Sequence, residues 1–249
     1  MFYVSCQLQY TPHIGQVNLR ELRGFDEISL GNVGTSGAIT LLDALLQPNA
    51  GQAISAAALV TADRDAVMGA LYKRLFGHRI ESTLTCTCSQ KFDLDFSLDD
   101  FAAHLLASRE QGGFEVTENG QYSLSDGADS FRLPTGQDEL AVLGLSPEEA
   151  SNMLVALCID KGSDLIKSQA AMAAIAPVWQ TDMAAQCPEC GDVQSVLFDM
   201  QGFLLRRLLQ ERDSLAAEVH LLAMAYKWSY NDIMNLPRSQ RKMFVSLIT

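Results

Sequence analysis

The feature that most constrains this chain is a pair of short cysteine turns, Cys86-Thr87-Cys88 and Cys187-Pro188-Glu189-Cys190, which lie about a hundred residues apart. Each turn is followed by the same apolar pattern, with phenylalanines eight and thirteen residues after its second cysteine: Phe96 and Phe101, then Phe198 and Phe203. A tetrahedral structural metal takes four soft donors, and one short turn can direct only two sulfurs at it. The turns are therefore expected to be two halves of one zinc site, with ligands Cys86, Cys88, Cys187 and Cys190.

The second turn has the composition of a zinc knuckle, because Pro188 stiffens it and Gly191 can adopt the positive φ that directs amides at the thiolates. The first turn, with one residue between its cysteines, is tighter. In a reducing compartment, close cysteine pairs bind metal more often than they form disulfides. Ordinary buried thiols are the alternative for these four. Cys6 and Cys158 lie outside the turns, and Cys158 is expected to be a small buried hydrophobe.

Length and charge restrict the class of protein. The 249 residues are 48% hydrophobic, which is enough for one sizeable core or two small ones. No run approaches the roughly 18 apolar residues of a membrane span, and the first residues lack signal-peptide features, so a cytoplasmic protein is expected. The net charge is −12, and residues 92–149 hold thirteen acidic residues against two basic ones. This charge distribution argues against nucleic-acid binding as the main role.

The first part of the chain, residues 1–110, mixes both kinds of secondary structure. A strand and a glycine-rich loop are expected first, followed by helices over residues 38–46 and 61–76, the second capped by Thr61 or Asp63 and ended at Gly77. Period-two alternation predicts strands over residues 79–85 and 92–98, on either side of the first cysteine turn. Asp99 or Asp100 is expected to cap a short helix that runs to Leu106.

Residues 111–176 are predicted to form an acidic insertion between the cysteine turns. Asn119-Gly120, flanked by alternating residues over 114–124, predicts a β-hairpin, and Phe131-Arg132-Leu133-Pro134 continues the sheet. Ser146, Pro147 and Glu149 form a capping box for a helix to about Asp160, and a second helix is expected over residues 163–176. Such an insertion would be held to a fixed base by the metal site.

The last part, residues 177–249, contains the second cysteine turn and a helical region. Apolar residues recur every three or four residues from Phe203 to Tyr226, which predicts a helix. Ser229, with Asp232 three residues later, is expected to cap a further helix. Glu218 and His220 lack the second histidine of a metalloprotease helix, so no open metal site is expected. The expected fold class is α+β: a small sheet with a zinc-ribbon-like site of four cysteines, a β-hairpin and helical insertion, and a C-terminal helical region.

Several runs of residues carry a resemblance to a known family. They are Asp63-Arg64-Asp65, Leu71-Tyr72, Phe76-Gly77, Phe131-Arg132-Leu133-Pro134-Thr135-Gly136-Gln137-Asp138, Cys187-Pro188-Glu189-Cys190-Gly191 and residues 218–238, with Tyr226-Lys227-Trp228-Ser229 and Leu236-Pro237-Arg238. From about Leu59 on, the chain resembles the baseplate hub assembly proteins of T-even-type phages and contractile injection systems. The resemblance implies a non-enzymatic baseplate component or assembly factor, made in the cytoplasm of the host or producing cell, which either stays in the tail particle or leaves it. The paired cysteines of this chain fit a zinc-ribbon-like version of the family, although its first turn has one residue between the cysteines instead of the usual two.

These observations favour a protein that acts by protein–protein contacts, with baseplate or hub proteins as partners. An aromatic and basic C-terminal surface is the predicted contact site, because such residues are enriched at interfaces: Tyr226, Trp228, Tyr230, Met234, Arg238 and Arg241. The alternative is that these residues close the local helical core. The alternative function is a nucleic-acid-binding zinc ribbon whose C-terminal helix-turn-helix carries Arg238, Arg241 and Lys242. An enzyme is not expected, since no phosphate loop, serine elbow or open metal site is present, and no small-molecule substrate is indicated.

Overall fold

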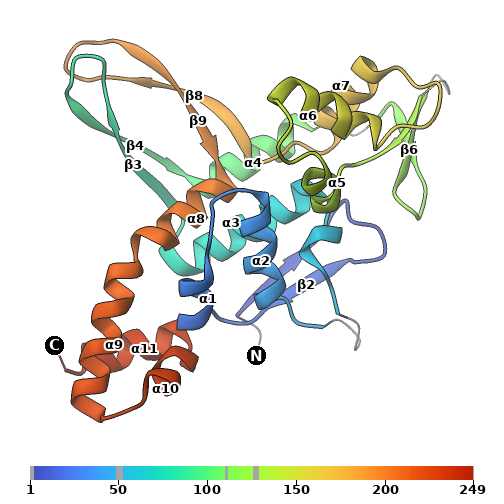
Figure 1. The fold of residues 1–249 in the computed structure, drawn as a ribbon. Helices are drawn as coiled ribbons and strands as arrows, with labels where there is room; N and C mark the ends of the chain where they lie inside the picture. Colours follow the sequence, from blue (N-terminus) through green and yellow to red (C-terminus); the bar gives the residue numbers. More distant parts are fainter. Residues whose placement is uncertain (1–2, 49–52, 110–111, 126–128, 249) are drawn as a thin grey trace. The chain divides into compact units, whose positions relative to one another are not determined.

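The computed structural model describes residues 3–48, 53–109, 112–125 and 129–248. The chain forms two compact units (Figure 1). We call Met1–Gln7, Gln16–Ala56 and Gly202–Thr249 the terminal unit, and Leu8–Gly15 with Ala57–Gln201 the central unit. Both combine helices with small antiparallel sheets, as the predicted α+β class requires. Their bounds differ from the predicted segments 1–110, 111–176 and 177–249, because the two ends of the chain fold into one unit.

The central unit is organised around helix α3 (Thr61–Phe76), whose bounds match the sequence-based prediction. Gly77 ends it with a φ of +90°, a conformation that favours glycine. The predicted capping by Thr61 or Asp63 is wrong, since Val60 is the N-cap and no side chain caps the helix. The Asp63 carboxylate instead accepts hydrogen bonds from the backbone N–H groups of Gln9, Tyr10 and Thr11 at 2.6–2.9 Å. It thereby fixes the loop of residues 8–15 to the helix.

The two cysteine turns belong to two equivalent hairpin-and-helix segments. One comprises β3 (Arg79–Thr85), β4 (Lys91–Ser97) and α4 (Leu98–Ser108); the other comprises β8 (Gln180–Gln186), β9 (Val193–Asp199) and α8 (Met200–Gln210). Corresponding elements have equal lengths of 7, 7 and 11 residues. Equivalent backbone bonds join each helix start to its hairpin, Leu98 N–H to His78 at 2.8 Å and Met200 N–H to Trp179 at 3.0 Å. The matching phenylalanines in the sequence thus mark a structural repeat.

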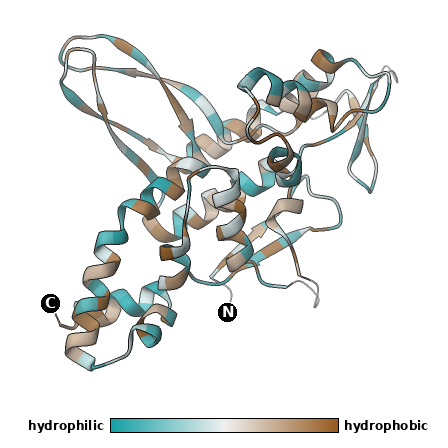
Figure 2. Cartoon of the chain, in the orientation of Figure 1, coloured by the Kyte–Doolittle hydropathy of each residue, from teal (hydrophilic) through white to brown (hydrophobic). Residues whose placement is uncertain are grey.

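The two hairpins pack against each other through one face of each. Hydrophobic and hydrophilic residues alternate along these strands, as Figure 2 shows by colour. Near the turns, the shared core contains Phe92 and Ala185, with Leu84, Leu94 and Val196 packed against it. At the helix end, the rings of Phe96 and Phe198 meet edge to face with centroids 5.1 Å apart, and Phe101 contacts Phe198 at 5.2 Å. Three of the repeated phenylalanines, Phe96, Phe101 and Phe198, therefore form one aromatic cluster.

The insertion between the hairpins has its own small sheet, and its core also includes Val60 and Ala62 at the start of α3. Strands β5 (Phe114–Val116), β6 (Gln121–Leu124) and β7 (Ser130–Arg132) pair in that order, which confirms the predicted hairpin at Asn119-Gly120. Helices α5 (Gly136–Ala141), α6 (Pro147–Ala156) and α7 (Leu165–Ile175) follow. The Ser146 capping box is confirmed, although α6 ends before the expected Asp160. The insertion core is Tyr122, Phe131, Leu133, Val155, Cys158, Met172 and Ile175, so Cys158 is buried as expected.

The terminal unit joins the first and last parts of the chain. Strands β1 (Val4–Gln7) and β2 (Gln16–Leu19) form a hairpin, followed by α1 (Gly24–Ser29) and α2 (Thr35–Leu45); the short 3₁₀ turn η1 (Ala56–Ala58) leads away from it. From the C-terminal part come α8 from Gly202 on, α9 (Arg212–Tyr226), α10 (Tyr230–Asn235) and α11 (Arg238–Ser246). Ser229 and Asp232 form the predicted capping box of α10.

Each unit contains the same short motif, Arg-x3-Gly-x-Asp-Glu, between a strand and a short helix. In the central unit, Arg132 donates to Asp138 through both terminal nitrogens at 2.6 and 2.7 Å, and Glu139 pairs with the buried Arg64 at 2.8 Å. In the terminal unit the corresponding residues are Arg20 with Asp26 at 2.6 and 2.8 Å, and Glu27 with the buried Arg241 at 2.9 Å. The motif therefore attaches a short helix to a longer one by ion pairs in both units.

One further expectation needs correction. Leu98 begins α4 instead of ending β4, and Ser97 caps this helix, with its hydroxyl accepting from the Asp100 N–H at 3.2 Å. Asp99 and Asp100 lie in the first turn, where their negative charge is favourable near the helix N-terminus. Ser97 caps the helix, and Asp99 and Asp100 do not, because Ser97 precedes the first turn and its hydroxyl reaches the N–H three residues later.

Candidate metal centre

The tips of the two hairpins in the central unit hold the four cysteines in equivalent positions. In the first tip, Cys86 N–H donates to the Gln90 carbonyl at 2.9 Å and Ser89 N–H donates to the Cys86 carbonyl at 2.8 Å. In the second, Cys187 N–H donates to Asp192 at 2.8 Å and Gly191 N–H to Cys187 at 2.9 Å. In both tips the N–H of the first cysteine therefore bonds to the far end of the loop. The inner bond closes a turn of four residues in the first tip and of five in the second, in line with the different cysteine spacing.

Both turns place one residue in the left-handed region, at equivalent positions. Gly191 has a φ of +76°, as the knuckle composition predicts, and Ser89 has a φ of +67°. A serine with positive φ is strained relative to glycine, because its Cβ approaches the backbone. The tighter first turn therefore places a left-handed residue directly after its second cysteine, as the second turn does, at a small conformational cost.

The four sulfur atoms lie close enough together to bind one ion. All four are within 4.8 Å of one another, with Cys86 Sγ 3.5 Å from Cys190 Sγ and Cys88 Sγ 3.9 Å from Cys187 Sγ. A tetrahedral ion with Zn–S bonds of about 2.3 Å places its sulfurs about 3.8 Å apart. The donor set and its spacing thus fit a tetrahedral metal ion. Each close pair joins the first cysteine of one turn to the second cysteine of the other, so both hairpins are needed for the site.

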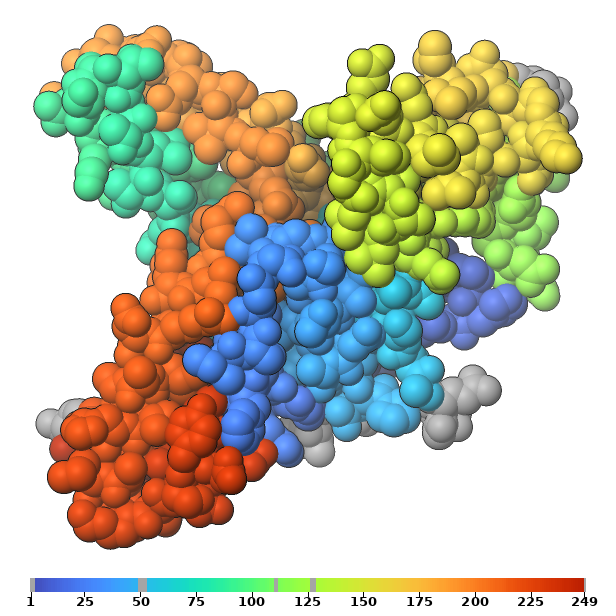
Figure 3. Space-filling view, in the orientation of Figure 1, coloured from blue at the N-terminus to red at the C-terminus, as the bar shows by residue number. Residues whose placement is uncertain are grey.

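The surroundings combine a dry inner side with an open outer side. Cys86 and Cys187 are 5% and 1% exposed, in the core shared by the two hairpins, whereas Cys88 and Cys190 are exposed. Figure 3 shows the two hairpins, teal-green and orange, packed directly side by side. All four cysteines are free thiols. An ion can therefore enter from the outer side and hold the two tips together.

The thiols have unequal acidity. The backbone N–H of Cys88 donates to the Cys86 sulfur and lowers the pKa of Cys86 to about 6. For Cys190, the N–H of Asp192 lowers the pKa, but the neighbouring thiols of Cys86 and Cys88 raise it, and the net pKa is about 12. One sulfur thus ionises readily while another keeps its proton, because adjacent thiolates repel each other. A divalent cation among them would favour the deprotonated form of all four.

The predicted contact residues of the C-terminal part divide between surface and interior of the terminal unit. Tyr230 is 53% exposed, and its ring meets Phe25 edge to face at 5.9 Å. Tyr226 and Trp228 are half-buried and stack on each other with centroids 4.8 Å apart. Both also contact Phe244, so these rings close the local helical core. Of the predicted aromatic residues, Tyr230 is the one whose ring is mainly on the surface.

Met234, Arg238 and Arg241 are interior residues, which corrects their assignment to a contact surface. They are 1%, 4% and 0% exposed. The Arg241 guanidinium binds both oxygens of Glu27 and also Glu218, and Arg238 binds Glu27 and Glu211. The sequence showed arginines beside aromatic residues but gave no sign of their glutamate partners, which are far away in the chain. The repeated Arg-x3-Gly-x-Asp-Glu motif was the available signal.

Comparison with protein-family models, curated proteins and solved structures finds no match to this chain. Among the helices of the described residues, none is long and apolar enough to cross a membrane. The fold and the site therefore define the protein as an α+β chain whose four-cysteine cluster can hold a metal ion.

Proposed function

We propose that this protein is a non-enzymatic structural or assembly component of a contractile phage tail or injection-system baseplate, in its hub region. It acts by protein–protein contacts, and a structural zinc holds the central unit in shape as a zinc-ribbon-like element. The observation that carries the proposal is the cysteine cluster, in which four sulfurs within 4.8 Å of one another come from two equivalent hairpins. Four thiolates complete a tetrahedral zinc site and leave no open position for a substrate or a reactive water.

The metal has a clear structural task in this arrangement. The hairpin tips share a core of four buried residues, which is small for two strands of seven residues on each side. Small cores are often supplemented by a structural metal or a disulfide. Cys86 and Cys187 would anchor the ion from the inner side, and Cys88 and Cys190 would close its outer side. When bound, the zinc contributes folding free energy and no chemistry.

The baseplate assignment draws on the residues that resemble the hub assembly family. Two of those runs lie at the ion-paired motifs of the two units. They are residues 131–138 in the central unit and Leu236-Pro237-Arg238 in the terminal unit. The resemblance therefore involves residues that determine how each unit folds. Exposed apolar residues in the terminal unit also support a role in protein contacts: Phe25, Met224, Tyr230, Met243 and Leu247.

The nucleic-acid alternative has less support. Its expected basic residues included Arg238 and Arg241, and both guanidinium groups are buried and bound to glutamates. Affinity for nucleic acid depends on exposed Lys and Arg that neutralise phosphates. Of that predicted basic group, Lys242 keeps an exposed side chain.

Co-expression with the neighbouring tail genes tests the proposal. We expect the purified protein to carry a baseplate or hub protein with it through size-exclusion chromatography. Tyr230→Ala removes a ring that is 53% exposed and is expected to weaken this association, while Lys227→Ala, an exposed neighbour, should leave it unchanged. Recovery of the protein alone from co-expression with every tail and baseplate protein of its gene cluster would refute the baseplate role.

A further inference from the structure

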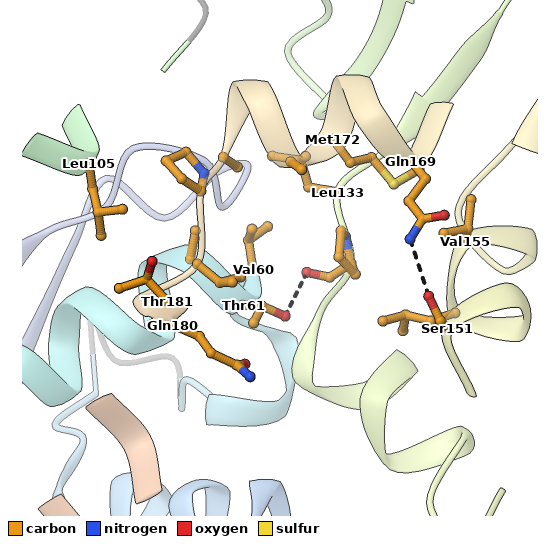
Figure 4. Close-up of a pocket in the computed structure, with 17 residues that line it drawn as sticks. Val60, Thr61, Leu105, Leu133, Ser151, Val155, Gln169, Met172, Gln180 and Thr181 are labelled. Atoms are coloured by element: carbon orange, nitrogen blue, oxygen red, sulfur yellow. Dashed lines mark hydrogen bonds between the residues drawn. The ribbon is translucent and has the colours of Figure 1, made fainter. Parts of the chain in front are cut away.

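The central unit has an apolar pocket that the metal site does not use. Its volume is about 430 Å³, and it opens between α3, the end of α4, and helices α6 and α7 (Figure 4). Pockets of about 300–1,000 Å³ accommodate ligands or groups of apolar side chains. None of the residues that line it is charged, and most are aliphatic, among them Val60, Leu105, Leu133, Val155 and Met172.

Three of the five polar side chains that line the pocket, those of Thr61, Ser151 and Gln169, hydrogen bond within the protein. The Gln169 amide donates to the Ser151 hydroxyl at 3.2 Å, and the Thr61 hydroxyl donates to the Pro134 carbonyl at 3.2 Å (Figure 4). The Thr61 hydroxyl also lies 2.9 Å from a carboxylate oxygen of Glu139. A polar ligand would have to compete with these bonds. The pocket is therefore suited to apolar groups and offers little to orient a polar small molecule.

The apolar surface continues beyond the pocket mouth. Val178, which lines it, is 37% exposed, and Leu106, next to the lining residue Leu105, is 44% exposed. Ile166 is 78% exposed and lies one helical turn before Gln169, on the stripe of α7 that faces the pocket. A small molecule inside the pocket would leave these side chains in water, whereas a longer apolar segment would cover them.

The electrostatic character of the walls indicates which segment would fit. From Gly136 to Ala156, which includes α5 and α6, there is no lysine or arginine. Of the four acidic residues there, Asp138 and Glu139 form ion pairs with arginines, and Glu148 and Glu149 are exposed in the first turn of α6. Glu148 is exposed on α6, one turn before the lining residue Ser151 and on the same side of the helix. A segment with basic residues beside its apolar ones would complement this rim.

We propose that this pocket and its rim are a docking groove for an amphipathic helix of a partner protein, with apolar residues at helical spacing and basic residues along its edges. The apolar residues enter between α6, α7 and the end of α4, and the basic residues lie near Glu148. The proposal rests on the proposed function to the extent that it names a surface through which the protein makes its contacts.

The test uses the purified protein and two fluorescent peptides. Both carry leucines at positions i, i+3, i+4 and i+7; one has lysines at the other positions, and its twin has glutamates. Binding is followed by fluorescence anisotropy, with competition by Nile red, a neutral hydrophobic dye. Ala173→Gln extends a neutral side chain from a lining position into the groove. Ala156→Gln on α6 is the matched control, since both positions are exposed and Ala156 neither lines the pocket nor lies three or four residues from a lining position.

We expect the lysine peptide to bind wild type and Ala156→Gln equally, and to bind Ala173→Gln about tenfold more weakly, since blocking a central apolar pocket removes the main anchor. Glu148→Gln should weaken it by about two- to fivefold at low salt, as for a rim charge. Equal binding to wild type and Ala173→Gln would overturn the groove assignment. If the glutamate twin binds with equal affinity, the inference that the partner is basic is refuted. If Nile red binds but neither peptide does, the pocket is a site for a small hydrophobic ligand, and the inference of a docked helix is refuted.

The outcome is separable from that of the proposed function. Peptide binding requires no tail protein, so its absence while tail proteins still co-purify would refute the groove alone. Loss of co-purification with normal peptide binding would refute the baseplate role alone.

Discussion

The aromatic cluster between the two hairpins makes a quantitative prediction about the central unit. Phe198 is 5% exposed and contacts two rings edge to face, those of Phe96 at 5.1 Å and Phe101 at 5.2 Å. Truncating a buried phenylalanine to alanine costs about 3–5 kcal/mol, because apolar burial is lost and a cavity remains. The two edge-to-face pairs account for about 1–3 kcal/mol of that cost. Phe198→Ala should therefore destabilise the central unit by about 4 kcal/mol.

Urea unfolding with tryptophan fluorescence measures this loss in the central unit. The chain has two tryptophans, Trp179 in the central unit and Trp228 in the terminal unit, so a Trp228→Phe background leaves Trp179 as the reporter. With a slope of about 2 kcal/mol per molar urea, a loss of about 4 kcal/mol lowers the midpoint by about 2 M. Val193→Ala is the matched control, because Val193 lies on the same strand and is 58% exposed.

The control should shift the midpoint by less than about 0.3 M, as expected for an exposed position. If Phe198→Ala behaves like Val193→Ala, the two hairpins are not held together by this cluster, and the description of the central unit as two packed halves is refuted.

Three further substitutions test other parts of the structure. Glu27→Gln removes the charge partner of the buried Arg241 and should cost the terminal unit about 3–5 kcal/mol; an unchanged urea midpoint would contradict the ion-pair network. Burial raises the pKa of the Asp65 carboxyl to about 7, so between about pH 4 and 7 this group is protonated in the folded state and ionised in the unfolded state. The free energy of unfolding of wild type therefore falls as the pH rises through this range. The stability of Asp65→Asn relative to wild type should therefore increase by up to about 4 kcal/mol from pH 4 to pH 8, and parallel pH profiles would argue against a raised pKa. Gly69→Ala would place a Cβ 2.3 Å from the Trp179 ring and should cost about 1–3 kcal/mol with a change in near-ultraviolet circular dichroism; wild-type spectra and stability would show that the ring moves freely.

Sequence periodicity predicted the local elements well where a strong pattern was present. Helix α3 was predicted with its observed bounds, and the capping boxes at Ser146 and Ser229 are present, because these signals depend on residues within one or two turns. Period-two alternation predicted the strands beside the first cysteine turn, which pair as β3 and β4, whereas β8 and β9 beside the second turn were not predicted. The convergence of the four cysteines followed from the chemistry of a tetrahedral site.

The features that the sequence did not predict all depend on contacts between residues far apart in the chain. Arg241 pairs with Glu27 across more than two hundred residues, and a local reading could only see a basic residue near aromatic ones. Asp63 resembled a helix cap, but its carboxylate binds a loop some fifty residues earlier in the chain. The division into units escaped detection for the same reason, since it depends on which segments meet in space. The short helices α1 and α5 are too brief for a periodic signal, and the repeated Arg-x3-Gly-x-Asp-Glu motif was the local feature that marks both.

The metal content of the purified protein tests the central claim most directly. Elemental analysis of wild type, Cys187→Ser and the matched variant Cys158→Ser, whose cysteine is buried outside the cluster, is combined with thermal unfolding of each. The account predicts about one zinc ion per chain in wild type and in Cys158→Ser, and loss of the metal with a lower unfolding temperature in Cys187→Ser. Wild type without bound metal, together with a Cys187→Ser variant that melts at the wild-type temperature, would contradict it.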